Sequence, residues 1–293
     1  MTRLINQGYS VDRVSDFFNI SRQAYYKRIM RNEFKINIYN KAEKVVQENR
    51  IIKSRSGLRS IYYKEGITDI GINQFEKEMS ARGYALKPKR SLIKTTDSRG
   101  NQYKFDNLIS GKKLNGENQV IVGDITYYQI ESGLYYIFHF VDYYTMEVKG
   151  LTGSRNMEGV NAEKCLRQTL SYNNKKIYDN KLILHTDGGS QYRSHNFQRM
   201  LIKAQILPSQ AENCLENGLS ERANGIIKND YLTDYKINSL KHLNYVLKKI
   251  QKQINEDWPS KILGYKTPKK YAEMVRSLKY KDRPIKLIKK FSK

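Results

Sequence analysis

Three acidic residues in the second half of the chain have the types and spacing to support chemistry. Asp124 lies in VGDITY (122–127), Asp187 in HTDGGSQY (185–192) and Glu221 in LSERANG (219–225). The chain around them is strongly basic, and a basic surface attracts polyphosphates whereas clustered carboxylates repel them unless a divalent cation lies between. The combination indicates metal-assisted chemistry on a nucleic acid.

The excess of positive charge supports this interpretation. The 293 residues include 53 Lys and Arg against 29 Asp and Glu, a net charge of +24 that is spread along the sequence. A well-solvated basic surface is the simpler explanation, but nucleic-acid binding is the better one at this charge. The 23 tyrosines could in part stack on bases or bond to phosphates.

Several other classes of protein are disfavoured. No apolar run approaches the roughly 20 residues that cross a bilayer, and the first residues, MTRLINQG, lack the apolar region of a signal peptide. Cys165 and Cys214 stand far apart and are expected to be free thiols. The four histidines show no metal-ligand spacing (His139, His185, His195, His242). We therefore expect a cytoplasmic protein with no membrane partner and no zinc site.

Each acid has an ordinary explanation when taken alone. Asp124 could be an edge-strand residue, Asp187 part of an Asp-Gly turn and Glu221 a solvated helix residue. Their order favours a joint site. A charge in the apolar strand around Asp124 is costly unless it is paired or binds metal, and Asp187 follows a strand end, where α/β sites form.

Neighbouring residues strengthen the prediction of a joint site. Gly188 and Gly189 are expected to leave the backbone open to the close approach of another chain. Lys228 lies seven residues after Glu221, nearly two helical turns, and the small Gly225 lies between them. Carboxylates that share two divalent ions could activate an oxygen nucleophile and stabilise the leaving oxygen at phosphorus. Hard oxygen ligands select Mg²⁺ or Mn²⁺.

The elements that carry the acids predict a mixed α/β sheet. The expected strands are Gln119–Ile130, Leu134–Tyr144, Glu147–Thr152, Lys181–His185 and one from Ile206, with Ser132-Gly133 as a hairpin turn. The expected helices are Met157–Tyr172, with Val160, Leu166 and Leu170 inward, one capped by Ser194 that runs to Ala204, Asn217–Tyr231 and Leu240–Glu256.

The first 90 residues predict small helical modules. A helix face at Val11, Val14, Phe17 and Phe18 precedes a tight turn, and Ser21 caps a second helix, Arg22–Met30. This is a helix-turn-helix pattern or an ordinary helical hairpin; the first predicts DNA contacts by Arg22, Gln23, Tyr26, Lys27 and Arg28. Helices Lys41–Lys53, Leu58–Lys64 and Ile72–Met79 form a second module. An extended basic piece follows it, with Lys87, Lys89 and Arg90 as DNA contacts.

At the acidic motifs the chain resembles the OrfB-type transposases of a large insertion-sequence family that shares the retroviral-integrase catalytic core. The matching stretches are DITY (124–127), DGGSQY (187–192) and ENGLSERANGIIK (216–228), with ISRQAYY (20–26), LKPKR (86–90) and LGYKTP (263–268) in support. Asp187 and Glu221 are 221 − 187 = 34 residues apart, slightly fewer than usual in the family, so the loop before the catalytic helix should be trimmed.

The resemblance implies an RNase H-like fold and a metal-binding catalytic triad of Asp124, Asp187 and Glu221. It also implies Mg²⁺ (or Mn²⁺)-dependent DNA cleavage and strand transfer with two ions. The DNA contacts expected around the triad are Lys228, Arg222, Asn224, Gln191 and Tyr192. The DNA partners are terminal inverted repeats and target DNA, held by at least a dimer at the bacterial nucleoid.

These considerations give a domain plan. It comprises a helix-turn-helix segment (1–35), a second helical DNA-binding module (36–92), a basic linker (93–116), an RNase H-like core (117–275) and a basic, disordered tail (276–293). Two alternatives to a transposase stay open. One is an RNase H-like hydrolytic nuclease that uses the same acids, and the other is an inactive, transposase-derived DNA-binding regulator.

Overall fold

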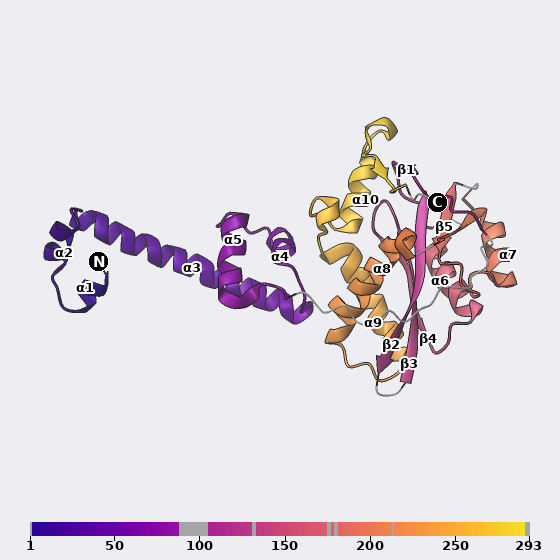
Figure 1. Cartoon of the computed structure of the whole chain (residues 1–293), viewed down its shortest axis with the longest axis horizontal. Helices are drawn as coiled ribbons and strands as arrows, with labels where there is room; N and C mark the ends of the chain where they lie inside the picture. Colours follow the sequence, from indigo (N-terminus) through magenta and orange to yellow (C-terminus); the bar gives the residue numbers. More distant parts are fainter. Residues whose placement is uncertain are drawn as a thin grey trace. The chain divides into compact units, whose positions relative to one another are not determined.

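The computed structural model describes residues 2–87, 105–130, 133–174, 177–178, 181–212 and 214–290. The chain forms two units (Figure 1). The first comprises Met1–Ile52 and Gly57–Lys87, and the second comprises Lys53–Ser56 and Pro88–Lys293. No helix in the described ranges is both long and apolar enough to cross a membrane.

The first unit begins with the predicted pair of helices joined by a tight turn. After α1 (Thr2–Asn6), α2 (Val11–Phe17) leads through Asn19, whose φ is 51°, into α3 (Arg22–Ile52). The hydroxyl of Ser21 accepts a hydrogen bond of 3.1 Å from the N–H of Ala24, which confirms the predicted cap. The predicted inward face was only half right, because Val14 is buried whereas Phe17 and Phe18 are exposed.

Helix α3 is longer than the sequence predicts. Its 31 residues include both the predicted helix Arg22–Met30 and most of the predicted helix Lys41–Lys53. Residues 31–40, RNEFKINIYN, contain neither Gly nor Pro, so nothing in this stretch stops the first helix. Residues 35 and 36, where we placed a domain boundary, therefore lie in the middle of one helix.

A three-helix cluster completes the first unit. Helices α4 (Leu58–Lys64) and α5 (Ile72–Met79) contact each other and α3, as predicted. A π-helical turn, η1 (Ser80–Tyr84), follows α5. The fully buried side chains of Val46, Ile61, Phe75 and Met79 form the core of the cluster. Lys87 is exposed, and the predicted contacts Lys89 and Arg90 lie outside the described residues.

The second unit is built on a five-stranded mixed sheet. Its strands are β2 (Val120–Ile130), β3 (Gly133–Asp142), β4 (Val148–Ser154), β5 (Leu182–Thr186) and β6 (Ile206–Gln210), in the order β4-β3-β2-β5-β6. Strand β3 is antiparallel to β2 and β4, whereas β5 is parallel to β2 and β6. Gly133 pairs with Ile130, so it belongs to β3 instead of the predicted turn; residues 131–132 lie outside the described ranges. The sheet confirms the predicted RNase H-like α/β class.

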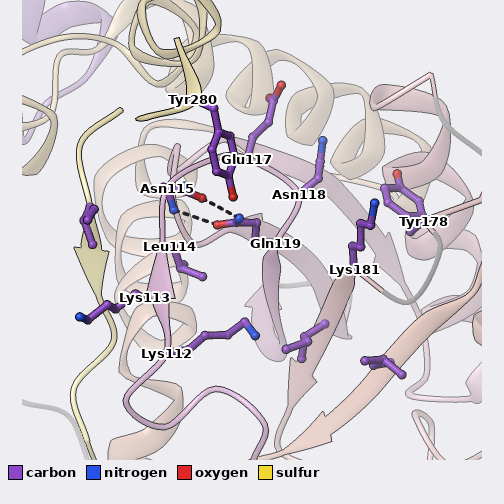
Figure 2. A pocket seen from close by; sticks show the side chains of 13 residues that line it. Lys112, Lys113, Leu114, Asn115, Glu117, Asn118, Gln119, Tyr178, Lys181 and Tyr280 are labelled. Carbon is purple, nitrogen blue, oxygen red and sulfur yellow. Dashed lines mark hydrogen bonds between the residues drawn. The ribbon is translucent and has the colours of Figure 1, made fainter. Parts of the chain in front are cut away.

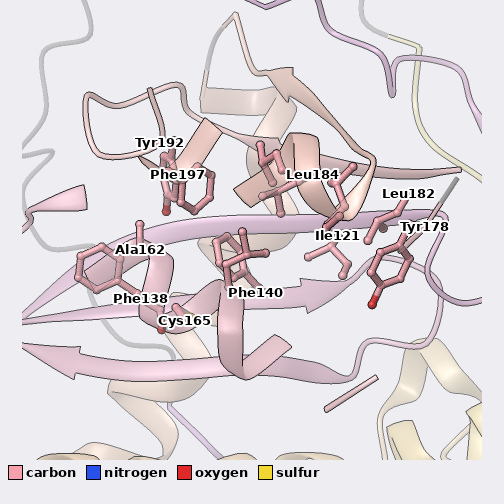
Figure 3. Packing of buried hydrophobic residues seen from close by; sticks show 14 residues of the cluster. Ile121, Phe138, Phe140, Ala162, Cys165, Tyr178, Leu182, Leu184, Tyr192 and Phe197 are labelled. Atoms are coloured by element: carbon pink, nitrogen blue, oxygen red, sulfur yellow. Dashed lines mark hydrogen bonds between the residues drawn. The ribbon is translucent and has the colours of Figure 1, made fainter. Parts of the chain in front are cut away.

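Helices cover both faces of this sheet (Figure 1). Helices α6 (Gly159–Tyr172) and α7 (His195–Ala204) lie on one side, and α8 (Gly218–Gly225) and α9 (Leu240–Lys252) on the other. Figure 3 shows the first layer, where Ile121, Phe140 and Phe197 belong to one buried cluster. The predicted inward set of α6 was right for Leu166, at 1% exposure, and wrong for Val160, at 54%.

Side-chain amides protect the edge strand β4. Asn255 accepts a hydrogen bond from the N–H of Val148 at 2.9 Å, and its Nδ2 donates to the same residue's carbonyl at 3.0 Å. Asn244 does the same for Gly153, at 2.9 and 3.0 Å. These bonds saturate backbone groups that could otherwise pair with a foreign strand. The π-helix η5 (Gln253–Asp257), which continues α9, carries Asn255.

The basic tail is folded over most of its length, contrary to the prediction of disorder. After α10 (Pro268–Ser277), residues Lys286–Leu287 form β7, which pairs antiparallel with β1 (Lys113–Leu114) at the end of the predicted linker. Leu114 and Ile288 are 0% and 1% exposed. These apolar residues among the lysines anchor both segments, because burying each side chain contributes about 1.5–3 kcal/mol.

Candidate active site

Strand β2 directs Asp124 towards α8. Side chains alternate along a strand, so Ile121 and Ile125 point into the cluster beneath α6 and α7, and Asp124 points the other way. Gly123, between Ile121 and Ile125 on the cluster side of the strand, has to be glycine because a Cβ there would lie 2.3 Å from the ring of Phe140. The strand can therefore carry a carboxylate on one face while a large aromatic ring fills the other.

Asp187 lies at the same edge of the sheet as Asp124. Val122 pairs with His185 across the parallel strands β2 and β5, and each aspartate stands two residues further along its own chain. The Asp187 carboxylate accepts a hydrogen bond of 3.0 Å from the N–H of Gly189. The prediction of a bare backbone here was wrong. Cβ positions built on Gly188 and Gly189 would lie 2.2 Å from the side chains of Gln210 and Gln191 respectively.

Helix α8 is fastened to β2 by two asparagines that flank Glu221. Asn217 donates from Nδ2 to the carbonyl of Gly123 at 3.3 Å, and Asn224 donates from Nδ2 to Oδ2 of Asp124 at 2.8 Å. Glu221 lies between them in sequence, near the start of the helix, and is exposed. The short 3-10 helix η2 (Cys214–Asn217) directly precedes α8.

Lys228 does not follow the α-helical spacing that we predicted. Residues Ile226–Tyr231 form a π-helix, η3, directly after α8, so seven residues no longer correspond to two α-helical turns. The ammonium of Lys228 lies 4.4 Å from the centroid of the Tyr127 ring on β2. This cation–π contact holds a positive charge beside the strand that carries Asp124.

The local electrostatics disfavour an ionised Asp124. Burial and then the negative charge of Asp187 raise its pKa to about 7, with a smaller contribution from Glu221. The N–H of Ile125, at 2.8 Å from Oδ1, and the amide of Asn224 act in the opposite direction. The pKa of Asp187 is raised too, because neighbouring atoms displace part of the water around its carboxylate even though the residue is exposed. The Gly189 hydrogen bond and the charge of Arg193 act in the opposite direction.

The histidine opposite Asp124 supplies no compensating charge. His139 pairs with Asp124 across β2 and β3 and is fully buried. Burial lowers its pKa to about 4, so the imidazole is neutral near pH 7. His139 therefore adds no positive charge that would stabilise an ionised Asp124.

The donor set fits a hard divalent cation. Two carboxylates at one sheet edge, of which Asp187 raises the pKa of Asp124, are what a cation site presents before the ion binds. Carboxylate oxygens are the ligands that Mg²⁺ and Mn²⁺ prefer. Among the residues that the structure describes, however, no three His, Cys, Asp or Glu side chains converge closely enough to hold a metal ion.

The other predicted DNA contacts occupy varied positions. Arg222 is exposed and Gln191 half-buried, whereas Tyr192 is 3% exposed within the core cluster. Its ring packs against Phe197 and is closed to DNA in this conformation, which corrects its predicted contact. On α3 the predicted contacts are all exposed (Arg22, Gln23, Tyr26, Lys27, Arg28).

Comparisons with known proteins identify the family of the chain. Two models described as "Integrase core domain" match residues 115–213 and 203–268. The chain belongs to the insertion-sequence transposases of the retroviral-integrase superfamily. It is therefore a polynucleotidyl transferase that acts in DNA transposition and integration. Such enzymes form the DDE class, which is named for two aspartates and a glutamate. The family implies DNA binding, oligomerisation and divalent-metal dependence.

Curated relatives come from several bacteria. The transposase of insertion element IS904 from Lactococcus lactis is 27% identical over 67% of this chain and 78% of its own length. An uncharacterised 31 kDa protein of element IS600 from Shigella sonnei is 28% identical over 57% of this chain and 60% of its own length. A protein of element IS986/IS6110 from Mycobacterium tuberculosis is 29% identical over 39% of this chain and 43% of its own length.

Among solved structures, the chain is similar to the catalytic core domain of HTLV-2 integrase in complex with magnesium. The match has 24% identity and a TM-score of 0.44, over 57% of this chain and 99% of that one. The BIV integrase core matches with 18% identity and a TM-score of 0.43, over 55% and 97%.

Sequence reasoning missed the structural roles of Asn217, Asn224 and His139. Asn224, a predicted DNA contact, also hydrogen-bonds Asp124. The position of His139 could have been found by counting. Ile130 pairs with Gly133, and counting back along the antiparallel strands from this pair places residue 139 opposite residue 124.

Proposed function

We propose that Asp124, Asp187 and Glu221 are the catalytic carboxylates of this transposase, which cuts DNA at the ends of its insertion sequence and joins them to target DNA. The observation that carries the proposal is the shared position of Asp124 and Asp187 at one sheet edge, with α8 fastened to Asp124 through Asn224. Both aspartates have raised pKa values, chiefly because their carboxylates have lost part of their water, a feature typical of functional carboxylates.

The metal ligands in this proposal are the same three side chains. Asp124, Asp187 and Glu221 would hold Mg²⁺ or Mn²⁺ through their carboxylate oxygens. The bound ions supply activation of an oxygen nucleophile and stabilisation of the developing charge at phosphorus. The hydrogen bonds from Ile125 N–H and Asn224 fix the orientation of the Asp124 carboxylate.

The reaction is two successive displacements at phosphorus. In the first, water attacks a phosphodiester at the element's end, and the bond to the 3′ oxygen breaks to leave a free 3′-hydroxyl. In the second, that hydroxyl attacks a target phosphodiester, so one phosphodiester forms as another breaks. Lys228, held beside β2 by Tyr127, is positioned to contact the DNA backbone at this edge.

The remaining parts of the chain suit the recognition of ends. The exposed side chains at the start of α3 (Arg22, Gln23, Tyr26, Lys27, Arg28) would read the terminal inverted repeats, as the second helix of a helix-turn-helix does. Because two ends must be joined together, at least a dimer acts on the DNA. Such a protein works at the bacterial nucleoid.

The test is strand cleavage and joining on a terminal-repeat duplex in Mg²⁺. Asp187→Asn should abolish both reactions and leave DNA binding nearly intact, whereas Asp257→Asn, at an exposed acid on η5, should change neither. Wild-type joining activity in Asp187→Asn would refute the triad. Cleavage without joining by the wild type would identify a hydrolytic nuclease, and binding without cleavage would identify a regulator.

A further inference from the structure

A cavity of about 850 Å³ opens at the edge of the sheet opposite to the acidic residues (Figure 2). Its lining includes residues that precede β2 and β5, among them Gln119 and Lys181, as well as Tyr280 of the tail. Asp124 lies five residues beyond Gln119, about 16 Å at the usual rise of a strand. The cavity is thus separate from the candidate active site.

The cavity carries uncompensated positive charge. Lys112 and Lys113 from the β1 segment and Lys181 before β5 all line it and are exposed, and none forms a salt bridge with another described residue. The acid Glu117 also lines it, but Arg276 binds both of its carboxylate oxygens, at 2.7 and 2.6 Å. The buried Lys149 lies 3.7 Å away from the same carboxylate.

The walls combine fixed amides with an exposed aromatic ring. Asn115 and Gln119 hold each other through two hydrogen bonds of 2.9 Å, one from the N–H of Asn115 and one between the side chains. Tyr280 projects from the tail towards this pair in Figure 2 and is 65% exposed. The β1–β7 pairing closes this side, so the tail forms a wall of the cavity.

We infer that this cavity is a second nucleic-acid site, which binds the backbone of single-stranded DNA away from the carboxylates. Lysines that track phosphates beside an exposed aromatic ring are the combination that proteins use for unpaired strands. The guanidinium of Arg283 lies 5.7 Å from the centroid of the Tyr280 ring, but the ring is 65% exposed and can still stack on an unpaired base. Base pairs within a duplex do not expose such faces. The three lysines lie on opposite sides of the cavity, so one strand would be held from both sides.

The experiment measures binding of a fluorescein-labelled single strand of about 20 nucleotides by anisotropy. It uses the full chain in EDTA, so that cleavage cannot contribute, across about 50–200 mM salt. The triple variant Lys112→Ala, Lys113→Ala, Lys181→Ala is compared with Lys164→Ala, Lys203→Ala, Lys248→Ala. The control removes the same charge at exposed lysines that line no part of this cavity.

The cavity variant should bind the single strand more weakly than the control variant. Its plot of log affinity against log salt concentration should also be less steep by about 2, since each of the three lost phosphate contacts contributes about 0.7 to the slope. Tyr280→Ala should weaken binding roughly 5- to 150-fold, and Tyr280→Phe should not. An equal slope for the two triple variants would overturn the site. An unchanged affinity of Tyr280→Ala would overturn the single-strand assignment. Neither outcome depends on whether the triad is catalytic.

Discussion

The side-chain amide of Asn224 on α8 donates a hydrogen bond of 2.8 Å to the Asp124 carboxylate on β2. The bond joins a helix to a strand that lies 100 residues earlier in the chain. It also opposes the burial and the like charges that raise the Asp124 pKa. Asn224 thus acts as a positioning residue that favours the charged form of a proposed metal ligand.

Removing this donor should shift the pH dependence of the reaction. In Asn224→Ala the pKa of Asp124 should rise further above its present value of about 7, because a hydrogen bond to a charged group contributes about 1.5–3 kcal/mol. That energy corresponds to roughly one to two pH units. The pH of half-maximal strand cleavage at fixed Mg²⁺ should move upwards by this amount, and further in Asn224→Asp, which adds a negative charge.

The matched control is Asn196→Ala, at an exposed position on α7, which should keep the wild-type profile. A purely structural role for Asn224 would lower the rate equally at every pH. An unchanged midpoint with reduced activity would therefore contradict the positioning role.

The raised pKa of Asp124 also predicts how the metal-free protein responds to pH. In the folded chain Asp124 keeps its proton up to about pH 7, whereas the ordinary value is 3.8. The folded state thus binds more protons between these values, so the free energy of unfolding falls as pH rises from about 4 to 7. Asp124→Asn removes this loss and should be more stable than wild type at pH 8 by at most about 4 kcal/mol.

Urea unfolding in EDTA at pH 5 and pH 8 measures this effect as the difference between wild type and Asp124→Asn. Mg²⁺ should reduce the difference by stabilising the ionised carboxylate. A variant that is less stable than wild type at pH 8 would show that Asp124 is not under electrostatic strain.

The sequence predicted the sheet and the position of two acids because both follow from local patterns. Apolar, β-branched stretches around Asp124 and before Asp187 give strands, and parallel neighbours end at the same edge. Neither inference requires knowledge of distant packing.

What the sequence did not predict depends on contacts between distant residues. The pairing of Lys286 with Leu114 turns a lysine-rich tail into part of the fold, and composition alone indicates disorder there. The π-helix after Gly225 moves Lys228 out of its expected register, and such turns have no periodic signature. The absence of a stop signal between Met30 and Lys41 could, in contrast, have predicted α3.

Two glycines beside the proposed catalytic acids should respond to substitution in opposite ways. Gly188, directly after Asp187, has a φ of 72°, and a Cβ there would lie 2.2 Å from the Gln210 side chain. Gly188→Ala should therefore lower the free energy of unfolding by about 1–3 kcal/mol. Gly225 has helical angles and nothing within 4 Å of its Cβ position, so Gly225→Ala should raise stability by up to about 1 kcal/mol.

Urea unfolding of the single variants and of Gly188→Ala with Gln210→Ala separates the two causes at Gly188. Truncating Gln210 removes the collision but leaves the left-handed backbone. Adding Gly188→Ala to Gln210→Ala should therefore still lower the free energy of unfolding, but by less than adding it to the wild type does. Wild-type stability in Gly188→Ala would show that the turn relaxes freely. In that case the turn would not fix the Asp187 carboxylate beside Asp124, and cleavage activity should also survive the substitution.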